Sequence, residues 1–312
     1  MKQIILMIAI LMFSLNVVAQ QKSENKINNE GQTSFVPPRT SFEGKAEPEI
    51  SMAARDFNNR GVKKTLIEQN YAEATKLFRQ AVESDGRCSV CQYNLGMSLI
   101  NNANYDESIK VFIQLISINP QDVNAQAGLG EAYYRKGLFK ESIAPYEKAV
   151  MLEPKDAILF SNLGSAFFQI KDFNQALIYF DKALKIDPNL LVANSNRGAA
   201  LHSLGRFKEA LKNLQHAVTL QPDSADVQSN LGVLMGSLGK EKEANKHFLE
   251  AVRLRPKYEI GLYNLAMNYL KMGKRELAHR QLSTLQDIDP KLAENLKKAY
   301  FGKYLIDVSA FK

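Results

Sequence analysis

The sequence predicts an all-α fold, a solenoid of about seven helix–turn–helix units closed by a C-terminal capping helix. The first observation behind this prediction is a 34-residue period that runs through most of the 312 residues. The second is the spacing of apolar residues within each period, which follows the three-to-four-residue step of an amphipathic helix. The third is composition. Hydrophobic residues make up 45% of the chain and charged residues 23%, which excludes a wholly disordered chain and a polytopic membrane protein.

Residues 1–19 have the pattern of a secretory signal peptide. One lysine near the start precedes an apolar run from Ile4 to Leu15, and small or aliphatic residues follow as far as Ala19. An uncleaved membrane anchor is the alternative, but a spanning helix needs about 20 apolar residues, and Ser14 and Asn16 interrupt this run. We therefore expect cleavage after Ala19, a secreted or periplasmic (cell-envelope) location, and no stable membrane insertion of the mature chain.

Residues 20–50 form a segment of different composition. They are rich in Gln, Asn, Ser, Glu, Lys and Pro, with only scattered apolar residues. Such a segment buries too little apolar surface to offset its conformational entropy. We predict a disordered linker.

Residues 51–292 contain four columns of residues that recur every 34 positions. A proline closes each period, at Pro120, Pro154, Pro188, Pro222, Pro256 and Pro290. A small residue recurs at Gly96, Gly130, Gly164, Gly198, Gly232 and Ala266. A second small column runs Ala74, Ser108, Ser142, Ala176, Ala210, Ala244 and Ala278. A bulky column follows it at Phe78, Phe112, Tyr146, Phe180, Leu214, Phe248 and Leu282. Chance does not keep four columns in phase over seven units, so these residues predict seven repeats.

The fourth unit shows why each repeat is expected to be a pair of helices. Its apolar residues recur at helical spacing over 159–170 and again over 173–184. Gly164 and Ala176 remove bulk where the two helices approach each other, and Pro188 ends the second helix. No single unit buries its apolar face alone, so the stacked units share one core.

Both ends depart from the pattern. The first unit has ten residues from Gly61 to Tyr71 where the third has nine between Gly130 and Phe139, which predicts one extra residue in its turn. Residues 293–312 are expected to form the capping helix and a C-terminal tail, whose last residues alternate in a strand-like way.

The four columns resemble those of the tetratricopeptide repeat (TPR) family, over about residues 52–292. The resemblance implies a right-handed superhelical solenoid in which the first helix of each repeat lines a concave groove. It also implies protein or peptide partners rather than a chemical substrate.

The groove-facing column that lies two residues before the glycine is rich in asparagine. An Asn amide offers a donor and an acceptor together, which matches one peptide unit of an extended backbone. Family members with such a ladder bind extended peptides, and the resemblance implies the same possibility here. Ordinary packing is the alternative, because Asn is common at this position across the family. The column holds Asn94, Gly128, Asn162, Asn196, Asn230 and Asn264.

Neighbouring columns describe a nearly neutral groove with aromatic anchors and a positive charge toward each end. We expect the aromatic anchors to be Tyr93, Tyr134, Phe168 and Tyr263, and the charges to be Arg135 and Lys271. Tetratricopeptide clamps for acidic C-termini carry lysine three residues before the glycine, and this column contains none. The resemblance therefore disfavours such a clamp.

Little in the sequence suggests chemistry. Cys88 and Cys91 lack the setting of a redox, haem or zinc motif, so in an oxidising compartment we expect a local disulfide. The four histidines, at positions 202, 216, 247 and 279, lie in different units without a recurrent partner, and we expect them at the surface or groove edge. We identify no catalytic residue, metal site or cofactor motif.

These observations predict a non-enzymatic scaffold that binds protein or peptide partners in its groove. The alternative is a structural or assembly factor of a cell-envelope complex that acts through the convex face or the tail. A third hypothesis is an enzyme, or the targeting subunit of an enzyme. It requires an active site assembled from acidic or histidine side chains of distant repeats. Nucleic-acid binding is disfavoured, because the net charge is only +7 and acidic residues are interleaved with the lysines.

Overall fold

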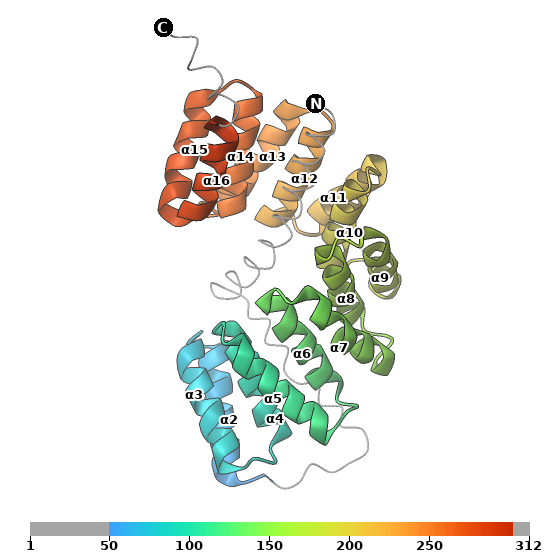
Figure 1. The fold of residues 1–312 in the computed structure, drawn as a ribbon, viewed down its shortest axis with the longest axis vertical. Helices are drawn as coiled ribbons and strands as arrows, with labels where there is room; N and C mark the ends of the chain where they lie inside the picture. The colour runs from blue at the N-terminus through green and yellow to red at the C-terminus, as the bar shows by residue number, and fades with distance from the viewer. Residues whose placement is uncertain (1–49, 302–312) are drawn as a thin grey trace. The chain divides into compact units, whose positions relative to one another are not determined.

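The computed structural model describes residues 50–301, which form fifteen α-helices, α2 to α16, and no β-strand (Figure 1). The all-α repeat architecture predicted from the sequence is confirmed. The described helices divide into two compact units at residues 186 and 187, and each unit is considered by itself. The predicted signal peptide, nearly all of the predicted linker and the C-terminal tail lie outside the described residues.

The first unit contains four helical pairs. In each pair the second helix packs against the first, and α3, α5 and α7 also pack against the first helix of the following repeat. Its helices are α2 (Met52–Leu66), α3 (Tyr71–Ser84), α4 (Ser89–Asn101), α5 (Tyr105–Ile118), α6 (Val123–Lys136), α7 (Phe139–Leu152), α8 (Ala157–Gln169) and α9 (Phe173–Ile186).

The second unit contains three helical pairs and the terminal helix, with the same packing pattern. Its helices are α10 (Leu191–Ser203), α11 (Phe207–Leu220), α12 (Ala225–Ser237), α13 (Glu241–Leu254), α14 (Glu259–Lys271), α15 (Arg275–Ile288) and α16 (Pro290–Phe301). The terminal helix begins three residues before the predicted position 293. It packs against α14 and α15 and buries Leu292, Ala293 and Leu296.

The glycine column marks the closest approach of the two helices in each repeat. A β-carbon built at Gly164 lies 2.8 Å from the Phe180 ring, and one built at Gly232 lies 2.7 Å from the Phe248 ring. The same conflict occurs at Gly61, Gly96, Gly130 and Gly198. Since real β-carbons do not approach other atoms so closely, the bulky residue of the second helix requires a glycine in the first helix of these six repeats. The seventh repeat has Ala266 and Leu282 at the corresponding positions.

The turn between the two helices also repeats. Each contains one residue with a positive φ, and from the second repeat onward these residues are 34 positions apart. Glycine fills four of the positions, at 137, 205, 239 and 273, because it adopts this conformation without steric cost. Ala103 and Lys171 fill two others, and Gln69 fills that of the first repeat. The first turn spans residues 67–70 and the next 102–104, so the extra residue expected after Gly61 lies in this turn.

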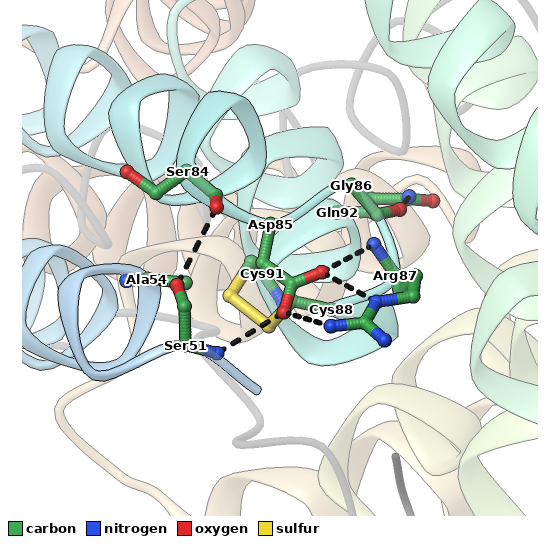
Figure 2. A network of polar contacts seen from close by, with 9 residues as sticks. All are labelled: Ser51, Ala54, Ser84, Asp85, Gly86, Arg87, Cys88, Cys91 and Gln92. Atoms are coloured by element: carbon green, nitrogen blue, oxygen red, sulfur yellow. Dashed lines mark hydrogen bonds and ion pairs between the residues drawn. A yellow bond between two sulfur atoms is a disulfide. The ribbon is translucent and has the colours of Figure 1, made fainter. Parts of the chain in front are cut away.

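The corner between α3 and α4 ties the first repeat together (Figure 2). The buried Asp85 carboxylate accepts hydrogen bonds from the Ser51 backbone N–H at 3.0 Å and from the Arg87 side chain at 3.0 and 3.1 Å. The bonds from Arg87 and from Ser51 hold the pKa of Asp85 well below its usual range. Cys88 and Cys91 form a disulfide beside this network, and both are buried against Ala54 and Ala81.

Candidate functional site

The predicted groove column places its asparagines on successive first helices. We call Asn94, Asn162, Asn196, Asn230 and Asn264 the amide column. Three of its members bond to the preceding first helix. Asn94 Nδ2 donates to Asn58 Oδ1 at 2.9 Å. In the second unit Asn230 Nδ2 donates to Ser195 Oγ at 3.0 Å, and Asn264 Nδ2 donates to Ser229 Oγ at 3.2 Å.

These bonds give the amide column a structural role that its spacing alone did not show. Asn94, Asn196, Asn230 and Asn264 are all buried, whereas Asn162 is half-buried. Gly128 occupies the same column in α6, and a β-carbon there would lie 2.4 Å from the Phe112 ring. The column therefore lies at the junction of neighbouring repeats.

The predicted aromatic anchors pack against rings of their own repeats. Tyr134 lies 5.1 Å from Phe139 and Phe168 lies 5.2 Å from Phe173, both edge to face. Tyr134 and Phe168 are 5% and 1% exposed, so in this structure they belong largely to the core.

The other two predicted anchors are tyrosines of the column three before the glycine. Tyr93 is half-buried beside Phe112, and its burial, followed by the nearby carboxylates of Asp122 and Glu131, raises its pKa to about 12. Tyr263 is buried, which also raises its pKa. Both hydroxyls therefore stay protonated at neutral pH and are available as donors.

The two predicted charges differ in their surroundings. Arg135 pairs with Glu131 at 3.4 Å, and Glu131 also accepts a hydrogen bond from the buried Tyr146 hydroxyl at 2.9 Å. Lys271 is exposed at the end of α14. It borders a narrow cleft of about 20 Å³ between α12 and α14, and also an open hollow of about 520 Å³ beside the α12–α13 turn. The narrow cleft has room for about one water molecule, whereas the hollow has the volume of a ligand site.

The expectation that all four histidines lie at the surface or groove edge is wrong for His202. This residue is fully buried in α10, and its Nε2 lies 2.7 Å from Ser237 Oγ of α12. Burial lowers the pKa of His202 to about 3, so its imidazole is neutral at physiological pH. His202 thus joins two repeats, as the amide column does.

Within residues 50–301, no group of three or more His, Cys, Asp or Glu side chains is arranged to hold a metal ion. None of the described helices is both long enough and apolar enough to cross a bilayer.

Comparisons with known proteins agree with this architecture. Residues 93–157 and 157–190 match family models described as tetratricopeptide repeat, and residues 198–239 match one described as TPR repeat. The chain is therefore a tetratricopeptide repeat protein. No curated protein sequence gives a significant match.

Many solved structures match this chain, and two of them cover about four-fifths of it. One is a tetratricopeptide repeat protein from Parabacteroides merdae ATCC 43184, with 12% identity and a TM-score of 0.68, covering 80% of this chain and 98% of that chain. The other comes from the APC/C hetero-tetramer Cut9-Hcn1, with 16% identity and a TM-score of 0.64, covering 79% of this chain. The present chain spans about half, 52%, of that second chain. The neighbours show the fold, and the repeat family supports a protein–protein interaction scaffold.

Sequence reasoning missed the partners of the amide column. Ser195 and Ser229 accept its hydrogen bonds from a position 35 residues earlier, one more than the repeat length. The sequence carried a usable signal, because serine recurs in the column directly before the asparagines. The sequence gave no sign of the hydrogen bond between the Ser51 N–H and the Asp85 carboxylate, because this bond forms only when α2 and α3 pack together in the first repeat.

Proposed function

We propose that this chain is an exported, non-enzymatic scaffold that binds an extended polypeptide along its first helices. The observation that carries the proposal is the amide column of the second unit. There Asn196, Asn230 and Asn264 stand on the successive first helices α10, α12 and α14. The Asn230 and Asn264 amides are each anchored to the first helix of the preceding repeat.

Anchoring matters because it fixes the orientation of each amide before a ligand arrives. A preorganised donor and acceptor lose less side-chain entropy on binding than a free surface side chain does. An asparagine side chain carries N–H donors and an acceptor oxygen, and these two kinds of group complement the C=O and N–H of one peptide unit in a strand-like segment. The adjacent tyrosine Tyr263 adds a rigid aromatic surface of the kind that contributes most to binding.

The anchoring bonds also supply a matched control. Asn230→Ala with Asn264→Ala removes both the bonds and the amides, whereas Ser195→Ala with Ser229→Ala removes the same bonds and leaves the amides. The probe is a set of short, capped, fluorescently labelled peptides of random sequence, from which binders to the full chain are selected. Their affinities for the three proteins are then measured by fluorescence anisotropy.

We expect the asparagine pair to lose peptide binding and the serine pair to retain most of it. Equal losses in both would mean that the column acts only by holding the repeats together. Retention by both would place binding elsewhere. Failure to select any peptide with the wild-type chain would refute the proposed peptide-binding function.

A specific observation also favours the alternative of a structural or assembly factor. Several large apolar side chains of the first unit are exposed on second helices, among them Ile118 of α5 at 68% and Met151 of α7 at 73%. Where exposed apolar groups lie together in a contiguous patch, they mark an interaction surface. Met151→Lys and Ile118→Lys separate the two functions, because these changes are expected to impair assembly with a protein partner and to leave peptide binding unchanged.

A further inference from the structure

A row of positive charges runs across the second helices of the second unit. Lys212 of α11, Lys246 of α13 and Arg280 of α15 are 34 residues apart, so they hold the same position in three successive repeats. All three side chains are exposed, and we call them the basic row. Lys208 and Lys242 are also exposed and precede the first two by four residues, which places them on the same faces of α11 and α13.

Acidic residues lie near the basic row, but most of them are bound to other cations. Glu209 pairs with Arg206 at 2.7 Å, Glu243 with Lys240 at 3.2 Å, and Glu250 with Arg253 at 2.7 Å. Within the part of the chain that the structure describes, no member of the basic row makes an ion pair. Glu276 lies one turn before Arg280 and reduces the positive charge at that end. The basic row therefore presents charges that the fold itself does not neutralise.

The packing of the second unit separates the basic row from the first helices. α10 packs against α12 and α12 against α14, whereas no packing of this extent joins α11 to α13 or α13 to α15. The second helices thus form a separate, more widely spaced layer. In the first unit the same column is interrupted, because Lys76 pairs with Glu73 at 3.4 Å, and Ala144 and Ile178 fill the third and fourth repeats. Among the seven described repeats, three consecutive unpaired cations occur in this column only in the second unit.

We propose that the basic row is a docking surface for an acidic segment of a partner protein. Opposite charges on two surfaces steer their encounter and fix their register, even where each exposed ion pair adds little affinity. Because the basic row has one cation in each of three equivalent repeats, a segment with several carboxylates can contact it at more than one point. The basic row lies on second helices, so this surface is distinct from the peptide site that we propose on the first helices.

Two other anionic partners fit the surface less well. Proteins that bind a bilayer surface combine cations with large apolar side chains that enter the lipid. Among the side chains described in the second unit, only Leu238 and Leu249 are large, apolar and exposed. Proteins that bind single-stranded nucleic acid stack its bases on aromatic rings, and no Phe or Tyr side chain is exposed over residues 187–299. The surface therefore favours an acidic polypeptide.

The test measures binding of a capped, fluorescently labelled decaglutamate peptide to the full chain by anisotropy, at low and at high salt. Decaglutamine is the uncharged control peptide, and phosphatidylcholine vesicles with and without phosphatidylglycerol are the lipid control. The row variant combines Lys212→Glu, Lys246→Glu and Arg280→Glu. The control variant combines Lys140→Glu, Lys155→Glu and Lys185→Glu, which alter exposed lysines of the first unit and change the net charge by the same amount.

We expect decaglutamate to bind the wild-type chain more tightly than decaglutamine, and high salt to weaken this binding because it screens exposed charges. The row variant should bind decaglutamate about 10- to 100-fold more weakly, since three exposed charges change from attraction to repulsion. The control variant should stay within about 3-fold of the wild type, because only its overall charge changes. Thermal unfolding shows whether each variant is folded. If the row variant is not, Lys212→Gln, Lys246→Gln and Arg280→Gln together decide the question.

The outcomes distinguish a specific surface from a general effect of charge. A preference for decaglutamate that the row variant loses and the control variant keeps supports the proposal. Equal binding of the two peptides to the wild-type chain, or equal losses in the row and control variants, overturns it. Binding of phosphatidylglycerol vesicles that the row variant loses, without a preference for decaglutamate, assigns the basic row to a membrane surface and also overturns it. None of these results depends on peptide binding by the first helices.

Discussion

Two glycines in α12 allow the packing argument to be tested with the same substitution in the same helix. Gly232 belongs to the glycine column, whereas Gly236 lies one turn later, where an added β-carbon would make only an ordinary contact with Ala244 at 3.9 Å. We predict that Gly232→Ala destabilises the protein and that Gly236→Ala stabilises it. Helix propensity is common to both changes, so the difference in sign reports the close approach of α12 and α13.

The magnitudes follow from the contacts of the added methyl group. At Gly232 it would lie 2.7, 2.8 and 3.1 Å from three atoms of the Phe248 ring, which is itself only 4% exposed. Overpacking of this kind costs about 1–3 kcal/mol, and the helix preference of alanine offsets part of it, so we expect a net loss of about 1–2 kcal/mol. At Gly236 only the propensity remains, and we expect a gain of about 0.5–1 kcal/mol.

Urea unfolding followed by far-ultraviolet circular dichroism measures both free energies, provided that the urea dependence (the m value) is unchanged. Phe248→Ala gives a second check. In that background the ring is gone, and Gly232→Ala should no longer destabilise. If Gly232→Ala stabilised the wild-type protein as Gly236→Ala does, the explanation of the glycine column by helix contact would be refuted.

Three further predictions concern other features of the chain. Lys171 has a φ of 65°, a conformation that glycine adopts without steric cost. Lys171→Gly should therefore raise the free energy of unfolding by about 0.5–1 kcal/mol, and a lower free energy in urea unfolding would contradict this. Reducing the disulfide between Cys88 and Cys91 should lower the free energy of unfolding by at most about 2 kcal/mol, because the loop that it closes is short. The control is the variant with both cysteines replaced by alanine, whose stability a reductant should not change. Burial lowers the pKa of His202, so the unfolded state takes up a proton first as the pH falls. Stability should therefore decrease from about pH 7 down to about pH 3, where the folded state also takes up the proton. The urea midpoint, measured as a function of pH, should fall less in His202→Gln than in the wild-type protein. An equal fall in both proteins would show that His202 is not the group responsible.

The fourth repeat shows how far periodicity alone can determine local structure. Apolar spacing predicted helices over 159–170 and 173–184, and the structure has α8 at Ala157–Gln169 and α9 at Phe173–Ile186. The helix starts are also local. Asp122, Asp156 and Ser224 recur at repeat boundaries, and each accepts a hydrogen bond from a backbone N–H in the first turn of its helix. Such features depend on neighbours within a few residues, so the sequence contains the information directly.

The candidate site was less predictable, because its properties depend on contacts between repeats. The asparagine spacing marked the amide column, but the bonds to Ser195 and Ser229 became visible only once successive first helices were packed together. His202 looked like a surface residue because its sequence neighbours gave no sign of burial. Its contact with Ser237 comes from the next repeat.

By itself, the sequence determined the repeat, its length, its helices and the residues that limit their approach, since each of these follows from helix geometry and the size of a side chain. Only the tertiary structure decided which members of a periodic column are held, which are buried and where space remains. The glycines at 232 and 236 are the same residue in one helix. The first fits beneath the ring of Phe248 and the second borders a cleft, because the second helix and the next repeat determine what each of them faces.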